Sequence, residues 1–404
     1  MPLKISFISS GALAVTLISM YASGFWIHPL PFHYISALSF VFIAVVSILS
    51  APRPAVTPSM PISAILAFAI YLFVQSSLIT SFSTASILYA ARTVFWASFA
   101  LLLYQFLTER QLISTLKTLM FFCLTALTLS TIISLYNKSP RLYPLGETNP
   151  NFWSTWLLAF IVLQVTRFEY QKKFIRFSVL TISLFFLTYL GSRSAILSAA
   201  IFLTMNTSSS LKEKSVLALI LTTCILFATG IYFILGFEFY QPMIDKIMME
   251  EGSFSKKGSR IVHLQTTIEA LIQTPQSIFF GYGIANEDAL SDFSKIVGGH
   301  VLLHSIFLQL LFGAGLASVV AFIFLIKKLI KHQKKYATIK NAKAGFWLIV
   351  SFLIHATFHP MLFNPVLWTL IPLFLAITAE KTPYNIGLHT IRKSYAQSFH
   401  DFSK

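Results

Sequence analysis

The sequence predicts an all-α, polytopic integral membrane protein with about 12 transmembrane helices and one long loop outside the membrane. Two observations support this fold class. First, 56% of the 404 residues are hydrophobic and only 11% are charged, a balance that soluble proteins do not have. Second, no charged residue lies between Lys4 and Arg53 or between Arg53 and Arg92, and each interval has room for two helices of about 20 residues.

The apolar stretches, taken in order along the chain, predict the individual helices. The first stretch follows a single lysine, as in a signal peptide, but its length and the spans behind it favour an uncleaved anchor. The expected spans cover residues 6–27, 33–51, 61–79, 86–107, 113–136, 151–166, 176–190, 194–206, 215–236, 301–326, 344–360 and 365–379.

The distribution of the net charge of +16 indicates how these helices are oriented. With twelve spans, both chain ends lie on one side of the membrane. The loops of that side and the ends themselves hold 21 of the 30 Lys and Arg residues, including a lysine-rich run at 327–343 that also favours contact with anionic lipids. Cytoplasmic loops carry the excess of basic residues in membrane proteins, so we expect both termini in the cytoplasm.

The segment from about 237 to 300 is the one sizeable piece that we expect outside the membrane. Inside it, apolar residues repeat at helical spacing after Arg260 and stop at Pro275, which predicts a short amphipathic helix with Arg260 in its first turn. The chain is therefore divided into spans one to nine (1–236), an outer loop domain (237–300), spans ten to twelve (301–379) and a cytoplasmic tail (380–404).

Composition and motif content exclude several classes of function. The basic residues lie in clusters between apolar stretches, so membrane lipids are the expected partner and nucleic acid is not. Cys123 and Cys224 both lie in apolar runs and are too few for a disulfide framework or a zinc site. None of the 14 acidic residues falls inside an expected span, which disfavours a proton-coupled transporter or flippase. No phosphate-binding loop or dinucleotide fingerprint occurs, so no cofactor is expected.

Arg193 is the first candidate for a binding residue. It lies 17 residues after Arg176 and 19 before Lys212, two residues expected at the cytoplasmic face. At about 1.5 Å per residue, it reaches the outer boundary of the hydrocarbon core, where the phosphates of lipid-linked substrates lie. Such an arginine can bind a phosphate, extend to lipid headgroups or cap a helix, and the sequence leaves these alternatives open.

Histidines provide the second group of candidates. His300 and His304 are four residues apart, so they share one helical face at the start of the tenth span. A metal site would need a third ligand, which the neighbouring sequence lacks. The pair can instead supply a general base at the mouth of a cavity, or two histidines at the membrane interface. His355 and His359, at the end of the eleventh span, are typical of interfacial histidines.

Two further basic sites have less specific surroundings. Arg92 lies about two turns inside the fourth span, and an intramembrane charge suggests a function by default, although its side chain can also extend to the membrane surface. Lys256 and Lys257 precede Arg260 in the outer loop. There they either assist in binding an anion or keep the loop solvated.

Three groups of residues resemble the O-antigen ligase and polymerase superfamily. These groups are Gly191-Ser192-Arg193-Ser194 continuing to Leu197, Gly258-Ser259-Arg260 continuing to Gly281-Tyr282-Gly283, and His304-Ser305 continuing to Gly313-Ala314-Gly315. They occur in the family's order over roughly residues 145–320. The third group is similar to the ligase pattern of a histidine, a small polar residue and a glycine-containing helix. Ser318 departs from that pattern, which has Gly, Thr or Tyr at this position.

The resemblance implies a metal-independent glycosyltransferase of the GT-C type in the bacterial inner membrane. Its donor would be O-antigen on undecaprenyl diphosphate and its acceptor a sugar hydroxyl of lipid A-core, both at the periplasmic face, on which the outer loop domain lies. His304 would take the proton from the acceptor hydroxyl or orient it, and Arg193 and Arg260 would offset charge on the departing diphosphate. The residues that would have supporting roles near this site are His300, Arg92 and Lys257.

The same residues leave other activities open. An O-antigen polymerase would use the same donor with a second lipid-linked glycan as acceptor. Such polymerases usually have two substantial periplasmic loops, whereas this chain has one long loop and a short one near 137–150, which favours the ligase. A protein O-oligosaccharyltransferase would be longer, and a non-enzymatic lipid-glycan flippase would keep its activity without His304.

Overall fold

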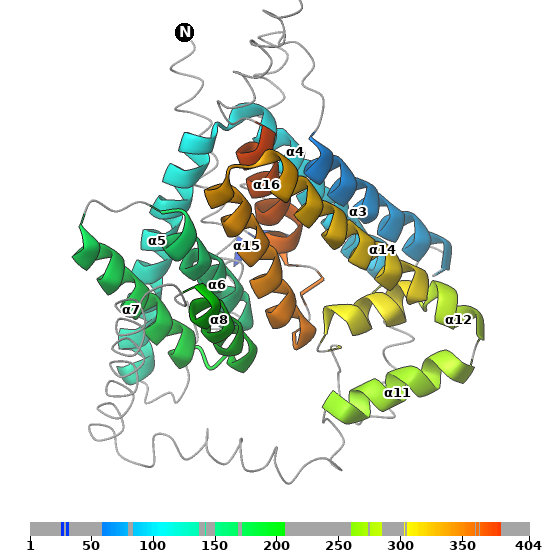
Figure 1. Ribbon diagram of the computed structural model, residues 1–404. Coiled ribbons are helices and arrows are strands. Elements are labelled where there is room, and N and C mark those ends of the chain that lie inside the picture. The colour runs from blue at the N-terminus through cyan, green and yellow to red at the C-terminus, as the bar shows by residue number, and fades with distance from the viewer. Residues whose placement is uncertain are drawn as a thin grey trace, which may run out of the picture.

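The computed structural model is helical through almost all of its described part, which confirms the all-α class (Figure 1). The exception is an antiparallel pair of two-residue strands, β1 (Trp26–Ile27) and β2 (Leu30–Pro31). We expected Trp26 and Ile27 to end the first span, and this is wrong, because prolines follow closely and favour extended backbone. The residues that the structure describes are 26–27, 30–31, 59–79, 84–136, 142, 150–168, 172–206, 260–273, 275–284, 303, 305–359, 361–362 and 364–380.

Nine helical segments of the described part correspond to expected spans. They are α3 (Met60–Ile79), α4 (Thr84–Phe106), α5 (Glu109–Tyr136), α6 (Pro150–Thr166), α7 (Lys173–Tyr189), α8 (Arg193–Asn206), α14 (Ile306–Tyr336), α15 (Ile339–Thr357), and the π-helical η1 (Val366–Leu370) continued by α16 (Ile371–Glu380). Two shorter helices, α11 (Arg260–Gln273) and α12 (Pro275–Phe280), belong to the expected outer loop domain. The expected spans 33–51 and 215–236 lie outside the described residues.

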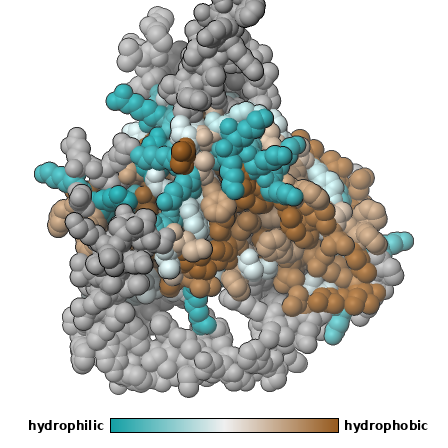
Figure 2. Space-filling model, viewed as in Figure 1, coloured by the Kyte–Doolittle hydropathy of each residue, from teal (hydrophilic) through white to brown (hydrophobic). Residues whose placement is uncertain are grey.

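Three of these helices are long and apolar enough to cross a membrane: α3, residues Glu109–Ser134 of α5, and α14. Several shorter apolar helices accompany them, including Trp153–Thr166 in α6 and Phe174–Tyr189 in α7. Figure 2 shows hydrophobic side chains over the side of the molecule where α12 and α14 lie. These features fit a membrane protein, while the total of twelve spans and the orientation of the termini stay predictions.

The tenth expected span differs from α14 in its limits and in its shape. We expected residues 301–326, but α14 begins at Ile306 and continues to Tyr336. The helix continues past the first lysines because lysine is a good helix former and does not stop a helix, and where the membrane ends along α14 stays a prediction. The helix is also broken at Gly315, whose φ of 72° and ψ of 179° are not helical. Two separate segments of α14 result, with different directions (Figure 1).

The packing of α8 against α15 defines two ends of the bundle. The helices are antiparallel, because Ser194 contacts His355, Ser198 contacts Ser351, and Phe202 packs on Trp347. We call one end the Arg193 end; it holds the start of α8, the end of α15 and the start of α14, whose Gln309 accepts a hydrogen bond from the Leu362 N–H at 3.0 Å. The opposite, lysine-rich end holds the last turns of α14 and the start of α15, where Figure 2 shows hydrophilic side chains.

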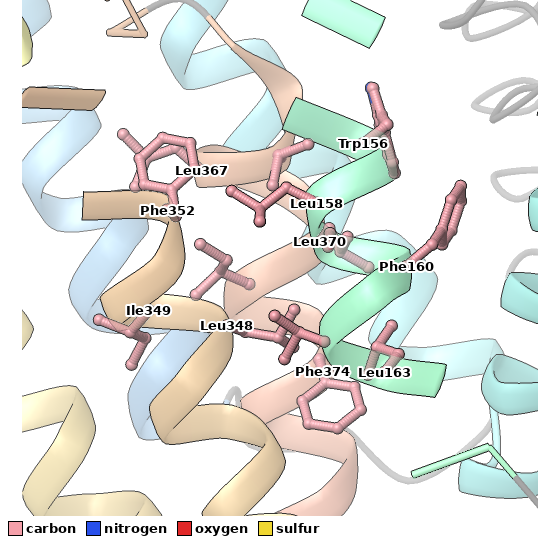
Figure 3. Close-up of a cluster of buried hydrophobic side chains, with 14 of the residues drawn as sticks. Trp156, Leu158, Phe160, Leu163, Leu348, Ile349, Phe352, Leu367, Leu370 and Phe374 are labelled. Carbon is pink, nitrogen blue, oxygen red and sulfur yellow. The ribbon is translucent and has the colours of Figure 1, made fainter. Parts of the chain in front are cut away.

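The core is centred where α6, α15 and the η1–α16 segment meet (Figure 3). Leu158 of α6, Phe352 of α15 and Leu370 of η1 converge there and are almost fully buried. Among lipids such side chains gain little from leaving water, so close packing supplies most of their stabilisation. The core therefore packs α6 and α15 together as a pair, on which α8 also packs.

Candidate functional site

Arg193 begins α8 directly after a tight turn from α7. The N–H groups of Leu190 and Gly191 close this turn by donating to the carbonyls of Phe186 (2.8 Å) and Thr188 (2.9 Å). Gly191 has a φ of 66°, which glycine adopts without steric cost. The Arg193 side chain is exposed. A cation at the positive end of a helix dipole does not stabilise the helix, so helix stability does not explain this arginine.

Ser192, which precedes α8, has a buried hydroxyl beside this arginine. Its side chain is 1% exposed, and the hydroxyl makes no hydrogen bond to any other described residue. A serine before a helix usually accepts a bond from an N–H of the first turn. Because this one does not, a hydroxyl with unused hydrogen-bonding capacity adjoins Arg193 at the start of α8.

Ser194, on the other side of Arg193, belongs to a buried hydrogen-bond chain across three helices. Its Oγ lies 2.8 Å from Nδ1 of His355 in α15, and Nε2 of His355 lies 3.1 Å from Oγ1 of Thr155 in α6. Thr155 in turn donates to Sδ of Met361 at 3.4 Å. The side chain of His355 is fully buried, and its ring centroid lies 4.9 Å from that of His359. These hydrogen bonds thereby join the start of α8 to α15 and α6.

The glycines of the second and third motif groups lie against each other. The N–H groups of Tyr282 and Gly283 donate to the carbonyls of Phe312 (2.7 Å) and Gly313 (2.8 Å) in the broken part of α14. This approach requires glycine: a Cβ on Gly281 would lie 2.6 Å from the backbone of α14, and a Cβ on Gly315 would lie 2.0 Å from the Phe279 carbonyl oxygen. The two glycine pairs of the sequence thus form one interlocked backbone structure.

α3 holds this interlocked structure in place. The Gln75 side-chain amide donates to the carbonyls of Phe280 and of Ala314, the latter at 2.8 Å, and the Ser76 hydroxyl accepts from the Ile284 N–H at 3.1 Å. The hydroxyl of Tyr282 donates to the Ala270 carbonyl and so adds α11 to the unit. The helix that begins with Arg260 and the first segment of α14 therefore belong to one packed unit.

The structure describes only some of the expected site residues. Arg260 is the first residue of α11, as the helical spacing predicted. His300, His304 and Lys257 lie outside the described residues, and Ser305, the neighbour of His304, is the N-cap residue of α14. The structure thus places Arg193 and the start of α14 at one end of the bundle.

Arg92 lies in a different part of the molecule. It is half-buried in α4, eight residues or about 12 Å after the helix begins at Thr84. α4 packs mainly on α3, η1 and α16, whereas the α8 that carries Arg193 packs on α6, α7 and α15. Arg92 and Arg193 are therefore carried by separate groups of helices.

The buried hydrogen bonds of His355 were not expected from the sequence. We expected His355 and His359 at the membrane interface, and their depth in the membrane stays a prediction. Their side chains are 0% and 7% exposed, so neighbouring helices cover them at the end of α15. A signal was present in the sequence. Ser194 and Ser198 are four apart, as are Ser351, His355 and His359, so each of two apolar segments carries a polar stripe.

Comparison with known proteins adds no family to these observations. No protein-family model and no curated protein matches this chain. Among the described residues, no group of three or more His, Cys, Asp or Glu side chains could hold a metal ion. A function can therefore be inferred only from the motif residues and from how the structure arranges them.

Proposed function

We propose that the protein is an O-antigen ligase. It transfers a glycan from undecaprenyl diphosphate to a sugar hydroxyl of lipid A-core at the periplasmic face of the inner membrane. The observation that carries this proposal is the interlocking of Gly281-Tyr282-Gly283 with Gly313-Ala314-Gly315. Motif pieces more than 25 residues apart in the sequence are in backbone contact, as expected if they form one site.

Each motif group has a chemical role in the proposed reaction. The acceptor oxygen attacks the anomeric carbon from the face opposite the diphosphate, the bond to the diphosphate breaks, and its electrons pass to the leaving phosphate oxygen. His304 takes the hydroxyl proton, as a general base with a pKa near the working pH can. Arg193 and Arg260 stabilise the leaving diphosphate, for which the fork of a guanidinium is well suited. The proposed reaction uses no metal.

Ser318 fits the ligase better than its departure from the pattern suggests. Its hydroxyl is fully buried and bonds to the carbonyls of Leu310 (2.9 Å) and Gly315 (2.7 Å), on both sides of the break in α14. A threonine, which the ligase pattern has at this position, carries the same hydroxyl. Ser318 therefore supplies no argument for the polymerase, which stays the second candidate for the same donor.

Reconstitution of the purified protein with undecaprenyl-diphosphate glycan and lipid A-core tests the proposal. We expect the glycan on lipid A-core, with a chelator having no effect, whereas extension of a second lipid-linked glycan identifies a polymerase. His304→Ala should lower the transfer rate by about 10²- to 10⁴-fold while the protein still accumulates. Arg193→Lys, which keeps the charge and loses the fork, should impair transfer more than the control Lys328→Arg. Wild-type transfer by the His304 variant contradicts the proposed base.

A further inference from the structure

We propose that His355 is a positioning residue that fixes Arg193 for the diphosphate of the donor through Ser194. This inference rests on the proposed role of Arg193 as a diphosphate ligand. His355 is fully buried, so it does not touch a substrate itself. Ser194 is the covalent neighbour of Arg193, and its hydroxyl is the group that joins the start of α8 to α15. A shift of that hydroxyl is transmitted directly to the arginine.

The hydrogen bonds of the chain have a defined direction. The Thr155 hydroxyl donates to Met361, so it accepts from the N–H at Nε2 of His355. A neutral imidazole carries one N–H, so Nδ1 is an acceptor and receives the proton of the Ser194 hydroxyl. With this assignment the Ser194 hydroxyl donates to Nδ1 of His355, and the N–H at Nε2 donates to Thr155. Such a chain positions a backbone segment more precisely than apolar contact does.

The hydroxyl groups of α5 behave differently from Ser194. Thr115, Thr125 and Thr128 donate to the carbonyls four residues before them, at 2.8 to 2.9 Å, which is the usual choice of a hydroxyl in an apolar helix. Ser194 instead bonds to a side chain 161 residues away. The bond therefore fixes α8 relative to α15 and does not serve the helix alone.

Ser198 offers a matched control one turn further along α8. Its hydroxyl is also fully buried and donates at 2.7 Å to the Ser351 carbonyl of the same helix, α15. Ser194→Ala and Ser198→Ala thus each remove one buried hydrogen bond between the same two helices. The two bonds differ in that Ser194 adjoins Arg193 and bonds to His355.

The test measures binding of undecaprenyl diphosphate to the purified full-length protein in detergent, together with the KM for the glycan donor. We expect Ser194→Ala to raise the Kd and the KM about tenfold with little change in kcat, and Ser194→Thr, which keeps the hydroxyl, to stay near wild type. Ser198→Ala should leave the Kd within about twofold. Equal effects of the two alanine variants would overturn the positioning role and leave it as ordinary helix packing.

A double-mutant cycle separates this inference from the proposed function. In an Arg193→Ala background, Ser194→Ala should cause no further rise in Kd, because Ser194 acts through the arginine. A further tenfold rise there overturns the positioning role but leaves Arg193 as a ligand. If Arg193→Ala itself binds undecaprenyl diphosphate like wild type, the proposed diphosphate role fails, and the positioning inference fails with it. If Ser194→Ala does not accumulate, His355→Phe replaces it in both comparisons. This variant keeps a ring of similar size but removes the acceptor of the Ser194 hydroxyl, so the same rise in Kd is expected.

Discussion

The two ends of α15 carry polar clusters that differ in charge. At the lysine-rich end, Asn341 donates to Glu109 at 3.2 Å, and Glu109 also forms an ion pair with Arg167. At the Arg193 end, hydrogen bonds join Thr155, His355 and Ser194. The first cluster includes an ion pair within the protein, whereas the second lies beside Arg193, whose side chain is exposed. We therefore expect changes at the lysine-rich end to alter stability, and changes at the Arg193 end to alter function as well.

Alanine in place of glycine should give the largest difference between the ends. In Gly315→Ala the new Cβ lies 2.0 Å from the backbone oxygen of Phe279 at a φ of +72°, and the backbone cannot move away without opening the contact with residues 281–284. In Gly345→Ala the nearest atoms are in the side chains of Leu375 (2.7 Å) and Gln333 (3.0 Å), which can rotate. We expect a loss above about 4 kcal/mol for the first and about 1 kcal/mol for the second.

The amount of monodisperse protein extracted from membranes measures this difference. Gly315→Ala should be almost absent from the monodisperse fraction, and Gly345→Ala should be close to wild type. Equal recovery of the two variants would mean that the break in α14 is not required for folding.

Breaking the ion pair tests whether the lysine-rich end is structural. Arg167→Ala leaves Glu109 charged and 17% exposed, without the partner that balances its charge. We expect a loss of about 3 kcal/mol in the free energy of unfolding, part of which Glu109→Gln should restore in the double variant. Thermal unfolding in detergent measures both effects, and transfer per folded molecule should not change. If the double variant transfers less glycan per folded molecule than wild type, the ion pair is not purely structural.

The helices were predictable because membrane lipids impose a local rule on the sequence. The expected span 61–79 coincides almost fully with α3, since most residues that face lipid or core are apolar whatever their neighbours are. Charged residues do not mark where a helix ends, as the lysines in the last turns of α14 show. A hydropathy pattern ends a predicted span at such charged residues, although the backbone there is still helical.

The contacts within the candidate site were not predictable from hydropathy. Gln75 bonds to a residue 205 positions away, and Ser194 to one 161 positions away. Which helices become neighbours depends on packing of the whole bundle, which no local pattern contains. The glycines were different: the motif identified Gly281 and Gly315 in advance, because a close backbone approach leaves a residue requirement in the sequence.

The two clusters can be compared by replacing one threonine in each with valine, which has nearly the same volume but no hydroxyl. Thr378 and Thr155 are both buried, and each hydroxyl is close to a side-chain donor of another helix: Gln333 at 3.0 Å and His355 at 3.1 Å. Either valine leaves that donor without this acceptor, so we expect each variant to lose about 1–2 kcal/mol of stability. Thr155→Val should also raise the KM for the donor several-fold, because His355 is then free to turn away from Ser194. A similar rise in KM for Thr378→Val would remove the distinction between the ends.

The smallest effect is expected for a hydroxyl that belongs to neither cluster. Thr125 is exposed on α5, and its hydroxyl donates at 2.9 Å to the Phe121 carbonyl of the same helix. Thr125→Val removes a hydrogen bond to a carbonyl that also accepts a backbone bond within the helix. No buried donor or acceptor loses its partner, so the free energy of unfolding should change by less than about 0.5 kcal/mol. Unfolding temperature and donor KM should both match wild type. A large change in either would mean that polarity within α5, and not only the clusters at the two ends of α15, determines how the bundle packs.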